Sequence, residues 1–223
     1  EAYYHAFDDQ QPKYWPQISL VNSGAIRSQG VCESREVLFG GPVKRKVLRD
    51  VLPFDNRVVA LTVTHKQLKN ILEHSMAKYD KTEPKGWFLQ VYGGEVFVDC
   101  REPGETLNAE GARATEGRRV TRIVIHHRSC EEDPSNPDCG KSVDLPLDPP
   151  SETETIRVTI DSFLQGGGDD FVDFKAVDPD AGDTLSAGSF NFEIVARYFS
   201  KAYPAEAPLP ATAEDRVHLH ECK

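Results

Sequence analysis

Two turns far apart in the chain carry the side chains best suited to binding an anionic ligand. Asn22-Ser23-Gly24-Ala25-Ile26-Arg27 brings an arginine to a turn that follows an apolar run. Phe163-Leu164-Gln165-Gly166-Gly167-Gly168-Asp169-Asp170 brings an aromatic ring, three glycines and two carboxylates. A guanidinium binds phosphate through two parallel hydrogen bonds, and Gly24, Gly167 and Gly168 would expose backbone N–H groups to a ligand. Together the turns predict two walls of one nucleotide pocket.

A second aromatic ring stands in Leu52-Pro53-Phe54-Asp55-Asn56. Because Pro53 ends a predicted helix, the ring of Phe54 is expected to project rather than pack. Two rings that face each other across a cleft clamp a purine by stacking, which is worth about 1–3 kcal/mol per base–aromatic contact. Asp169 has the chemistry to accept hydrogen bonds from a ribose diol.

Each of these features, taken alone, also has a purely structural interpretation. Arg27 could be a surface arginine paired with an acidic neighbour, and the glycine triplet could be a flexible loop with solvated aspartates. Phe54 and Phe163 could be separate core residues, which is the more common fate of phenylalanine. The residues by themselves leave these alternatives open.

The composition describes an ordinary globular protein. The chain has 223 residues, 39% hydrophobic and 28% charged, and no internal repeat, which favours one α+β domain with a mixed β-sheet covered by helices. A net charge of −10 argues against a nucleic-acid partner, since neutralising phosphates needs a basic surface. No apolar run approaches the roughly 20 residues of a membrane-spanning helix, so no membrane span is expected.

Periodicity and turn residues predict the elements that must position these side chains. Thr64 and Gln67 have capping-box spacing, and an apolar stripe follows them, so a helix begins there. Phe88 to Asp99 is typical of a hairpin that turns at Gly93-Gly94. Strands are predicted at 18–21, 58–63, 120–126 and 155–161, helices at 42–52 and 192–202, loops at 101–118 and 175–188, and an extended tail at 204–223.

The five cysteines predict one disulfide and an oxidising compartment. Cys130 and Cys139 enclose a polar, turn-rich insert that a disulfide would close. The partners of Cys32, Cys100 and Cys222 stay open, and because five is odd, at least one cysteine is free or pairs outside the chain. His218-x-His220-x-Cys222 could bind a metal, but a solvated terminus is the expectation, and no metal site is predicted in this chain.

Five segments in order, at 22–27, 51–55, 73–75, 88–94 and 163–170, resemble a known family. The chain is similar to the C-terminal domain of the 5'-nucleotidase family, which includes ecto-5'-nucleotidases, apyrases and UDP-sugar hydrolases. Family members carry Asn-Gly-Gly-Gly-Ile-Arg, Val-Leu-Pro-Phe-Gly, a helix with Glu-His-Ser, Phe-Leu-Gln-Val-Gly-Gly and Phe-Leu-Ala-Asn-Gly-Gly-Asp-Gly. The likeness runs from about Ile18 to the final helix.

The resemblance implies a role for each matched residue. Phe54 and Phe163 would sandwich the base, Asp169 would bind ribose hydroxyls, Arg27 would hold the phosphate, and Asn22 would contact the ligand from the same turn. A nucleoside mono- or polyphosphate, with an adenine nucleotide favoured, is the expected ligand. Five positions depart from the family pattern, and two of them add negative charge: Ser23, Ala25, Asp55, Gly166 and Asp170.

The catalytic parts of such an enzyme are not in this sequence. The resemblance implies that two divalent metals, zinc or similar, act in a separate N-terminal metallophosphoesterase domain. None of that domain's Asp-x-His, Gly-Asn-His-Asp/Glu and Gly-His-x-His motifs is found here. Residues 1–17 are similar to a family helix entered midway, plus a linker, so the chain is expected to be a fragment in which residues 18–203 form the nucleotide-binding domain and 204–223 the tail.

The expected function is therefore recognition without chemistry, in a secreted or extracellular protein, or a periplasmic one if bacterial. The isolated chain is expected to be inactive as a phosphohydrolase. Two other functions stay open: a stand-alone nucleotide- or nucleoside-binding module, and a degenerate family member that acts through its surface. Silence towards adenosine, AMP and UMP in calorimetry would favour the last of these.

Overall fold

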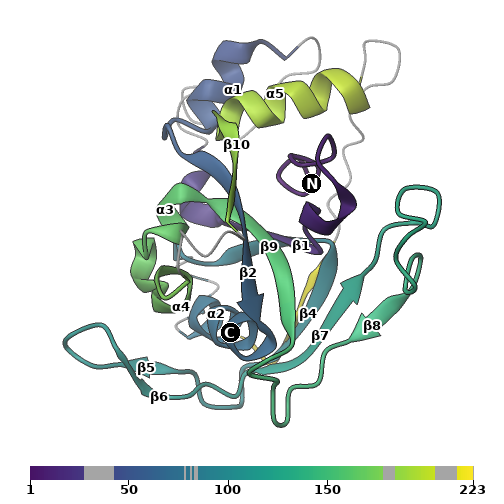
Figure 1. The fold of residues 1–223 in the computed structure, drawn as a ribbon. Helices are drawn as coiled ribbons and strands as arrows, with labels where there is room; N and C mark the ends of the chain where they lie inside the picture. The colour runs from purple at the N-terminus through teal and green to yellow at the C-terminus, as the bar shows by residue number, and fades with distance from the viewer. Residues whose placement is uncertain are drawn as a thin grey trace.

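The computed structural model describes residues 1–27, 43–77, 79–80, 82, 85–177, 184–203 and 215–222. Within these residues the chain is an α+β fold of two main β-sheets with helices packed against them (Figure 1). This confirms the fold class expected from the sequence.

The larger sheet has five strands and is mixed. Two neighbouring strands, β1 (Ile18–Asn22) and β9 (Thr155–Asp161), are parallel, whereas every other pairing in this sheet is antiparallel. In spatial order the strands are β10 (Leu185–Phe190), β2 (Arg57–Thr64), β9 (Thr155–Asp161), β1 (Ile18–Asn22) and β3 (Leu89–Tyr92).

The second sheet has four strands, and a two-stranded ribbon projects beside it. In order the strands are β11 (Val217–His220), β4 (Gly94–Asp99), β7 (Val120–His126) and β8 (Ser142–Asp144), with β11 parallel to β4. The ribbon consists of β5 (Thr106–Leu107) and β6 (Arg113–Thr115), and Figure 1 shows it extending away from the body of the molecule.

The helices are short except for two. They are α1 (Arg45–Val51), α2 (His65–Met76), α3 (Ser162–Gln165), α4 (Val172–Lys175) and α5 (Asn191–Ala202), with 3₁₀ turns at Pro12–Tyr14, Ser23–Ala25 and Gly168–Asp170. Figure 1 shows α1 and α5 side by side above the five-stranded sheet, and the contact between Arg45 and Glu193 joins them.

The main core lies around α2, between the two sheets. The predicted capping box is present, because Thr64 Oγ1 accepts a hydrogen bond from Gln67 N at 3.1 Å and Gln67 Oε1 accepts one from Thr64 N at 2.8 Å. The apolar stripe then packs against strands of both sheets. Its members, all nearly inaccessible to solvent, are Leu68, Ile71, Leu72 and Met76.

The opposite face of the five-stranded sheet has its own smaller core. Val58 and Ala60 of β2 point there and pack with Ile194 of α5. Tyr3 and Phe7 cover them from the N-terminal segment, which forms successive turns where the sequence predicted part of a helix. Because both faces of β2 are buried, the strand is apolar along most of its length.

Three predicted elements are wrong or incomplete. Phe88 to Asp99 is not a hairpin, because β3 pairs with β1 and β4 pairs with β7, so the chain passes from one sheet to the other at Gly93. Gly93 has φ +88, and a Cβ there would lie 2.6 Å from the Gln17 carbonyl oxygen. The loops predicted at 101–118 and 175–188 contain the β5–β6 ribbon and part of β10.

His218 to Cys222, predicted as a solvated terminus, are half-buried or exposed, but they do not form a free tail. β11 pairs with β4, and a disulfide between Cys100 and Cys222 fixes its end. The predicted disulfide between Cys130 and Cys139 is present as well. Cys32 and the predicted helix start at Pro42 lie outside the described residues.

Candidate functional site

Strand direction gathers the predicted site residues at one edge of the five-stranded sheet. β1 and β9 are parallel, with Ser19 paired to Thr159, so their C-terminal ends meet at the same edge. β2 is antiparallel to β9, with Val58 paired to Asp161, so β2 begins at that edge. The turn after β1, the segment before β2 and the turn after β9 therefore lie next to one another (Figure 1).

The turn after β1 is held by backbone hydrogen bonds. Gly24 N donates to the Gly86 carbonyl oxygen at 2.7 Å, and a Cβ on Gly24 would lie 3.1 Å from the Gly86 backbone, so the small residue permits this approach. Arg27 N donates to the Val51 carbonyl oxygen at 2.8 Å, which ties the turn to α1. The Arg27 guanidinium consequently lies over the Phe54 ring, 5.3 Å from its centroid.

The turn after β9 is built on a buried carboxylate. Asp161 is fully buried, and its Oδ1 accepts a hydrogen bond from Leu164 N at 3.0 Å, which begins α3. Burial is the largest influence on this carboxyl and raises its pKa, against the hydrogen bonds from the Leu164 backbone and from Asn56. α3 carries Phe163, whose side chain projects outward beside Gly168, where a Cβ would lie 2.5 Å from the ring.

The backbone that follows is left-handed at three positions. Gly167 has φ +83, Asp169 φ +54 and Asp170 φ +63. The glycine adopts this conformation readily, whereas each aspartate needs support from its surroundings. Asn22 supplies part of that support, since its Nδ2 donates to Asp169 Oδ2 at 2.8 Å and so links the two walls of the predicted pocket.

The exposure of the two phenylalanines bears directly on their function. Phe54 is 41% exposed and Phe163 is 42% exposed, so the interpretation of both as core residues is wrong. The structure thus pairs Arg27 with Phe54 and Asn22 with Asp169, and sets Phe163 against Gly168. Asp55, one of the departures from the family pattern, lies 3.5 Å from Arg49 Nη2 and forms an ion pair with it.

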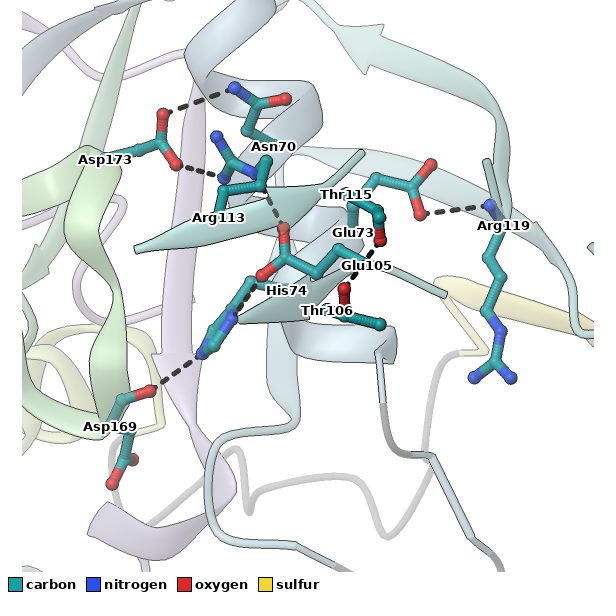
Figure 2. A network of polar contacts seen from close by, with 10 residues as sticks. All are labelled: Asn70, Glu73, His74, Glu105, Thr106, Arg113, Thr115, Arg119, Asp169 and Asp173. Carbon is teal, nitrogen blue, oxygen red and sulfur yellow. Dashed lines mark hydrogen bonds and ion pairs between the residues drawn. The ribbon is translucent and has the colours of Figure 1, made fainter. Parts of the chain in front are cut away.

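A buried polar network contacts the backbone of the Asp169 turn through His74, and it was not predicted from the sequence (Figure 2). His74 Nε2 lies 2.8 Å from the Asp169 carbonyl oxygen, and His74 Nδ1 lies 2.6 Å from Glu105 Oε1. Glu105 Oε2 accepts from Arg113 Nε at 2.9 Å, and Arg113 Nη2 donates to Asp173 Oδ2 at 2.5 Å. The Glu73-His74-Ser75 motif was the only signal of this network in the sequence.

The charges of this network depend on one another. Burial lowers the pKa of His74, but its hydrogen bonds to Glu105 and to the Asp169 carbonyl outweigh burial and hold that pKa above its usual value. Burial raises the pKa of Glu105, whereas the hydrogen bonds from His74 and Arg113 outweigh it and hold that pKa below its usual value. Both groups are therefore favoured in their charged forms.

The described residues do not offer a metal site. Among them no group of three histidine, cysteine, aspartate or glutamate side chains is arranged to hold an ion. His218 instead contacts Glu95 Oε2 at 2.8 Å, and Cys222 is in a disulfide. Two cavities, of about 560 and 580 Å³, flank α5, and none of the predicted site residues lines either of them. The structure also contains no helix long and apolar enough to cross a membrane in the part of the chain it describes.

The mixed sheet places Arg27, Phe54 and Phe163 at the same end of its strands, and sequence comparison shows the family to which this domain belongs. The family profile described as "5'-nucleotidase, C-terminal domain" matches residues 3–176. The chain belongs to this family. The resemblance inferred from the five motifs is thereby confirmed.

Relatives are similar over most of this chain but over a minor part of their own length. The snake venom 5'-nucleotidase of Gloydius brevicauda is 29% identical over 206 residues, which are 88% of this chain and 29% of that protein. The human 5'-nucleotidase is 28% identical over 201 residues, 86% of this chain and 28% of its own. The apyrase of Tabanus yao is 24% identical, over 98% of this chain and 33% of its own. The chain thus spans about a quarter to a third of these relatives.

Solved structures agree on the fold. The 5'-nucleotidase precursor from Thermus thermophilus superposes with a TM-score of 0.70 at 22% identity, over all of this chain and 35% of that one. The NAD nucleotidase NadN of Haemophilus influenzae gives a TM-score of 0.65 at 15% identity, over 98% of this chain and 32% of its own.

Proposed function

We propose that the chain is the nucleotide-recognition domain of a secreted phosphohydrolase of the 5'-nucleotidase or apyrase type. It clamps the base between Phe54 and Phe163, binds ribose through Asp169 and holds the phosphate with Arg27, while Asn22 contacts the ligand from the same turn. The observation that carries this proposal is the pair of exposed phenylalanine rings at one sheet edge, with Arg27 over the first of them. An exposed aromatic ring costs free energy in water, which a stacked base would recover.

The chemistry belongs to a second domain in this proposal. The relatives named 5'-nucleotidase and apyrase are three to four times as long as the matched region. An N-terminal two-metal metallophosphoesterase domain would cleave the nucleotide that this domain presents. Two disulfides, Cys100–Cys222 and Cys130–Cys139, support an oxidising, extracellular compartment.

Calorimetry on the purified chain tests the recognition proposal. Adenosine, AMP and UMP are titrated into wild type and into Phe54→Ala and Phe163→Ala, each of which should weaken binding by roughly 5- to 150-fold if one stacking contact is lost. Leu219→Ala is the control, because it removes an exposed apolar side chain from the other sheet and should bind as wild type does. If both phenylalanine variants bind the nucleotide as tightly as wild type does, the clamp is ruled out.

Two further measurements separate the parts of the proposal. Arg27→Ala should weaken AMP binding but leave adenosine binding nearly unchanged, because adenosine has no phosphate for the guanidinium to hold. Phosphate release from AMP by the pure chain with added Zn²⁺ or Mn²⁺ should be absent. Robust hydrolysis abolished by EDTA would place the chemistry in this chain and contradict the proposal.

A further inference from the structure

The hydrogen bonds of His74 fix the protonation of its ring. Both of its ring nitrogens face atoms that only accept hydrogen bonds: the Asp169 carbonyl oxygen at Nε2 and the Glu105 carboxylate at Nδ1. A neutral imidazole has one N–H and would leave one of these contacts as a repulsion between lone pairs. The hydrogen bond from Arg113 favours the ionised form of Glu105, and beside an ionised Glu105 both contacts are satisfied at once only when the ring is an imidazolium.

The groups around His74 are arranged for that positive charge. Glu105 accepts from both His74 and Arg113, and Arg113 in turn donates to Asp173, so the four side chains alternate in charge (Figure 2). The side chain of Glu105 is 1% exposed, and that of His74 10%. A buried chain of this kind is costly to break, because removing one charge leaves its partner unpaired.

Two further carboxylates belong to the segments around the His74 ring. On the same helix, Glu73 is buried, and its two oxygens accept hydrogen bonds from Arg119 N and Val120 N rather than from His74. From the Asp169 turn, Asp170 adds a nearby negative charge that favours the imidazolium. Among the described residues, the rings of Trp87 and Phe171 also contact His74, the latter edge-on at 4.6 Å between centroids.

The residue that His74 contacts has an unfavourable backbone conformation. Asp169 is left-handed, with φ 54 and ψ 29, a conformation that costs a non-glycine residue free energy. Its carbonyl oxygen receives the His74 bond, while its carboxylate receives the Asn22 bond. His74 therefore holds the backbone of Asp169 from the core, and Asn22 holds its side chain from the turn after β1.

We propose that His74 is a positioning residue for nucleoside binding, whose imidazolium form holds the backbone of Asp169 so that this turn presents its carboxylate to the ribose. The inference rests on the proposed role of Asp169 and adds to it a dependence on pH. When the ring loses a proton, the remaining N–H stays with the Glu105 carboxylate, which is the stronger acceptor, and the bond to Asp169 is lost.

The sign of the pH effect follows from the direction of the shift. Because the pKa of His74 is raised in the folded protein, its contribution is complete below the ordinary histidine value of about 6.5 and is lost as the pH rises through the folded pKa. Adenosine is the appropriate probe, since it lacks the phosphate whose own ionisation would change across this range. Its affinity should fall as the pH is raised above about 6.5, the ordinary histidine value.

Two substitutions at the same position separate positioning from simple packing. His74→Gln places an amide donor near the position of Nε2, so it retains the bond to Asp169 but does not titrate. His74→Asn places its amide near Nδ1, so it retains the bond to Glu105 and loses Asp169. We expect adenosine affinity in His74→Gln to be independent of pH, and in His74→Asn to be about 10-fold weaker than wild type at pH 6.

Measurements without ligand keep this inference separable from the proposed function. Ring-nitrogen NMR of the wild type should show both nitrogens of His74 protonated at neutral pH, and a neutral ring would overturn the inference. Amide exchange of residues 167–171 at one pH should be faster in His74→Asn than in His74→Gln, and equal exchange would also overturn it. If the exchange differs as expected but no nucleoside or nucleotide binds, the proposed function fails while the positioning of the turn stands.

Discussion

The glycine triplet at 166–168 allows the proposed clamp to be perturbed by one methyl group. A Cβ on Gly168 would lie 2.5 Å from the Phe163 ring, against 3.4 Å for the shortest ordinary contact, so the ring must move by about 0.9 Å (3.4 − 2.5). Because Phe163 is 42% exposed, it can move into solvent without disturbing the core. We therefore expect Gly168→Ala to fold with a cost below about 1 kcal/mol.

Displacing the ring should cost the stacking contact with the base. That contact is worth about 1–3 kcal/mol, so the dissociation constant for adenosine should rise roughly 5- to 150-fold in Gly168→Ala. Isothermal titration calorimetry with adenosine measures this effect, and a thermal unfolding curve of the same sample shows that the fold is intact.

The neighbouring glycine supplies the matched control. Gly166 has φ −71, and a Cβ there would meet its nearest atoms at 3.5 Å, which is ordinary contact. Gly166→Ala should therefore bind as wild type does and be about 0.4–1 kcal/mol more stable, since alanine restricts the unfolded chain. Wild-type affinity in Gly168→Ala would refute the placement of Phe163 against the base, and an equal loss in both variants would assign the effect to loop flexibility instead.

Three further predictions concern the fold. Cys222→Ser removes a disulfide with a sequence separation of 122 and should lower the unfolding free energy by about 5 kcal/mol. Cys139→Ser removes one with a separation of 9 and should lower it by about 3 kcal/mol, because a shorter loop restricts the unfolded chain less. Equal losses in chemical denaturation would contradict this dependence on loop length. Glu73→Ala leaves two buried backbone N–H groups without an acceptor and should cost at least about 2–3 kcal/mol by the same measurement, so a neutral effect would exclude its structural role. The hydrogen bond from His218 is the main cause that holds the pKa of Glu95 below its usual 4.5, so the ion pair stabilises above that value and is lost as the pH falls through the folded pKa. The Tm difference between wild type and Glu95→Gln should accordingly shrink on acidification below about pH 4.5, and a difference that grows would contradict the sign.

Local patterns were sufficient to predict the elements that carry the site. The capping box at Thr64 predicted where α2 begins. A short apolar run predicted β1, β-branched residues predicted β2, and alternation predicted β7 and β9, each to within one residue. The sequence also indicated which turns hold ligand-type side chains, since Arg27, Phe54, Phe163 and Asp169 do lie at one sheet edge. That the two rings enclose a base stays a prediction.

Non-local pairing is what the sequence did not reveal. A Gly-Gly pair between two apolar segments is compatible both with a hairpin and with a chain that passes from one sheet to another. Here the second arrangement forms because β3 pairs with β1 and β4 pairs with β7, and these partners are distant in sequence. Val217 to His220 is too short and polar to be recognised as a strand without its partner β4. Glu105 and Arg113 lie in a segment predicted as a loop, so nothing local placed them beside His74.

The bond between Cys100 and Cys222 also determines how the molecule responds to a protease. Any single peptide cut between these two residues leaves two pieces that remain joined through sulfur. Such a nicked molecule would run at its full mass on a denaturing gel and separate into two bands only after a reductant is added. Limited digestion without reductant would therefore conceal damage in more than half of the chain.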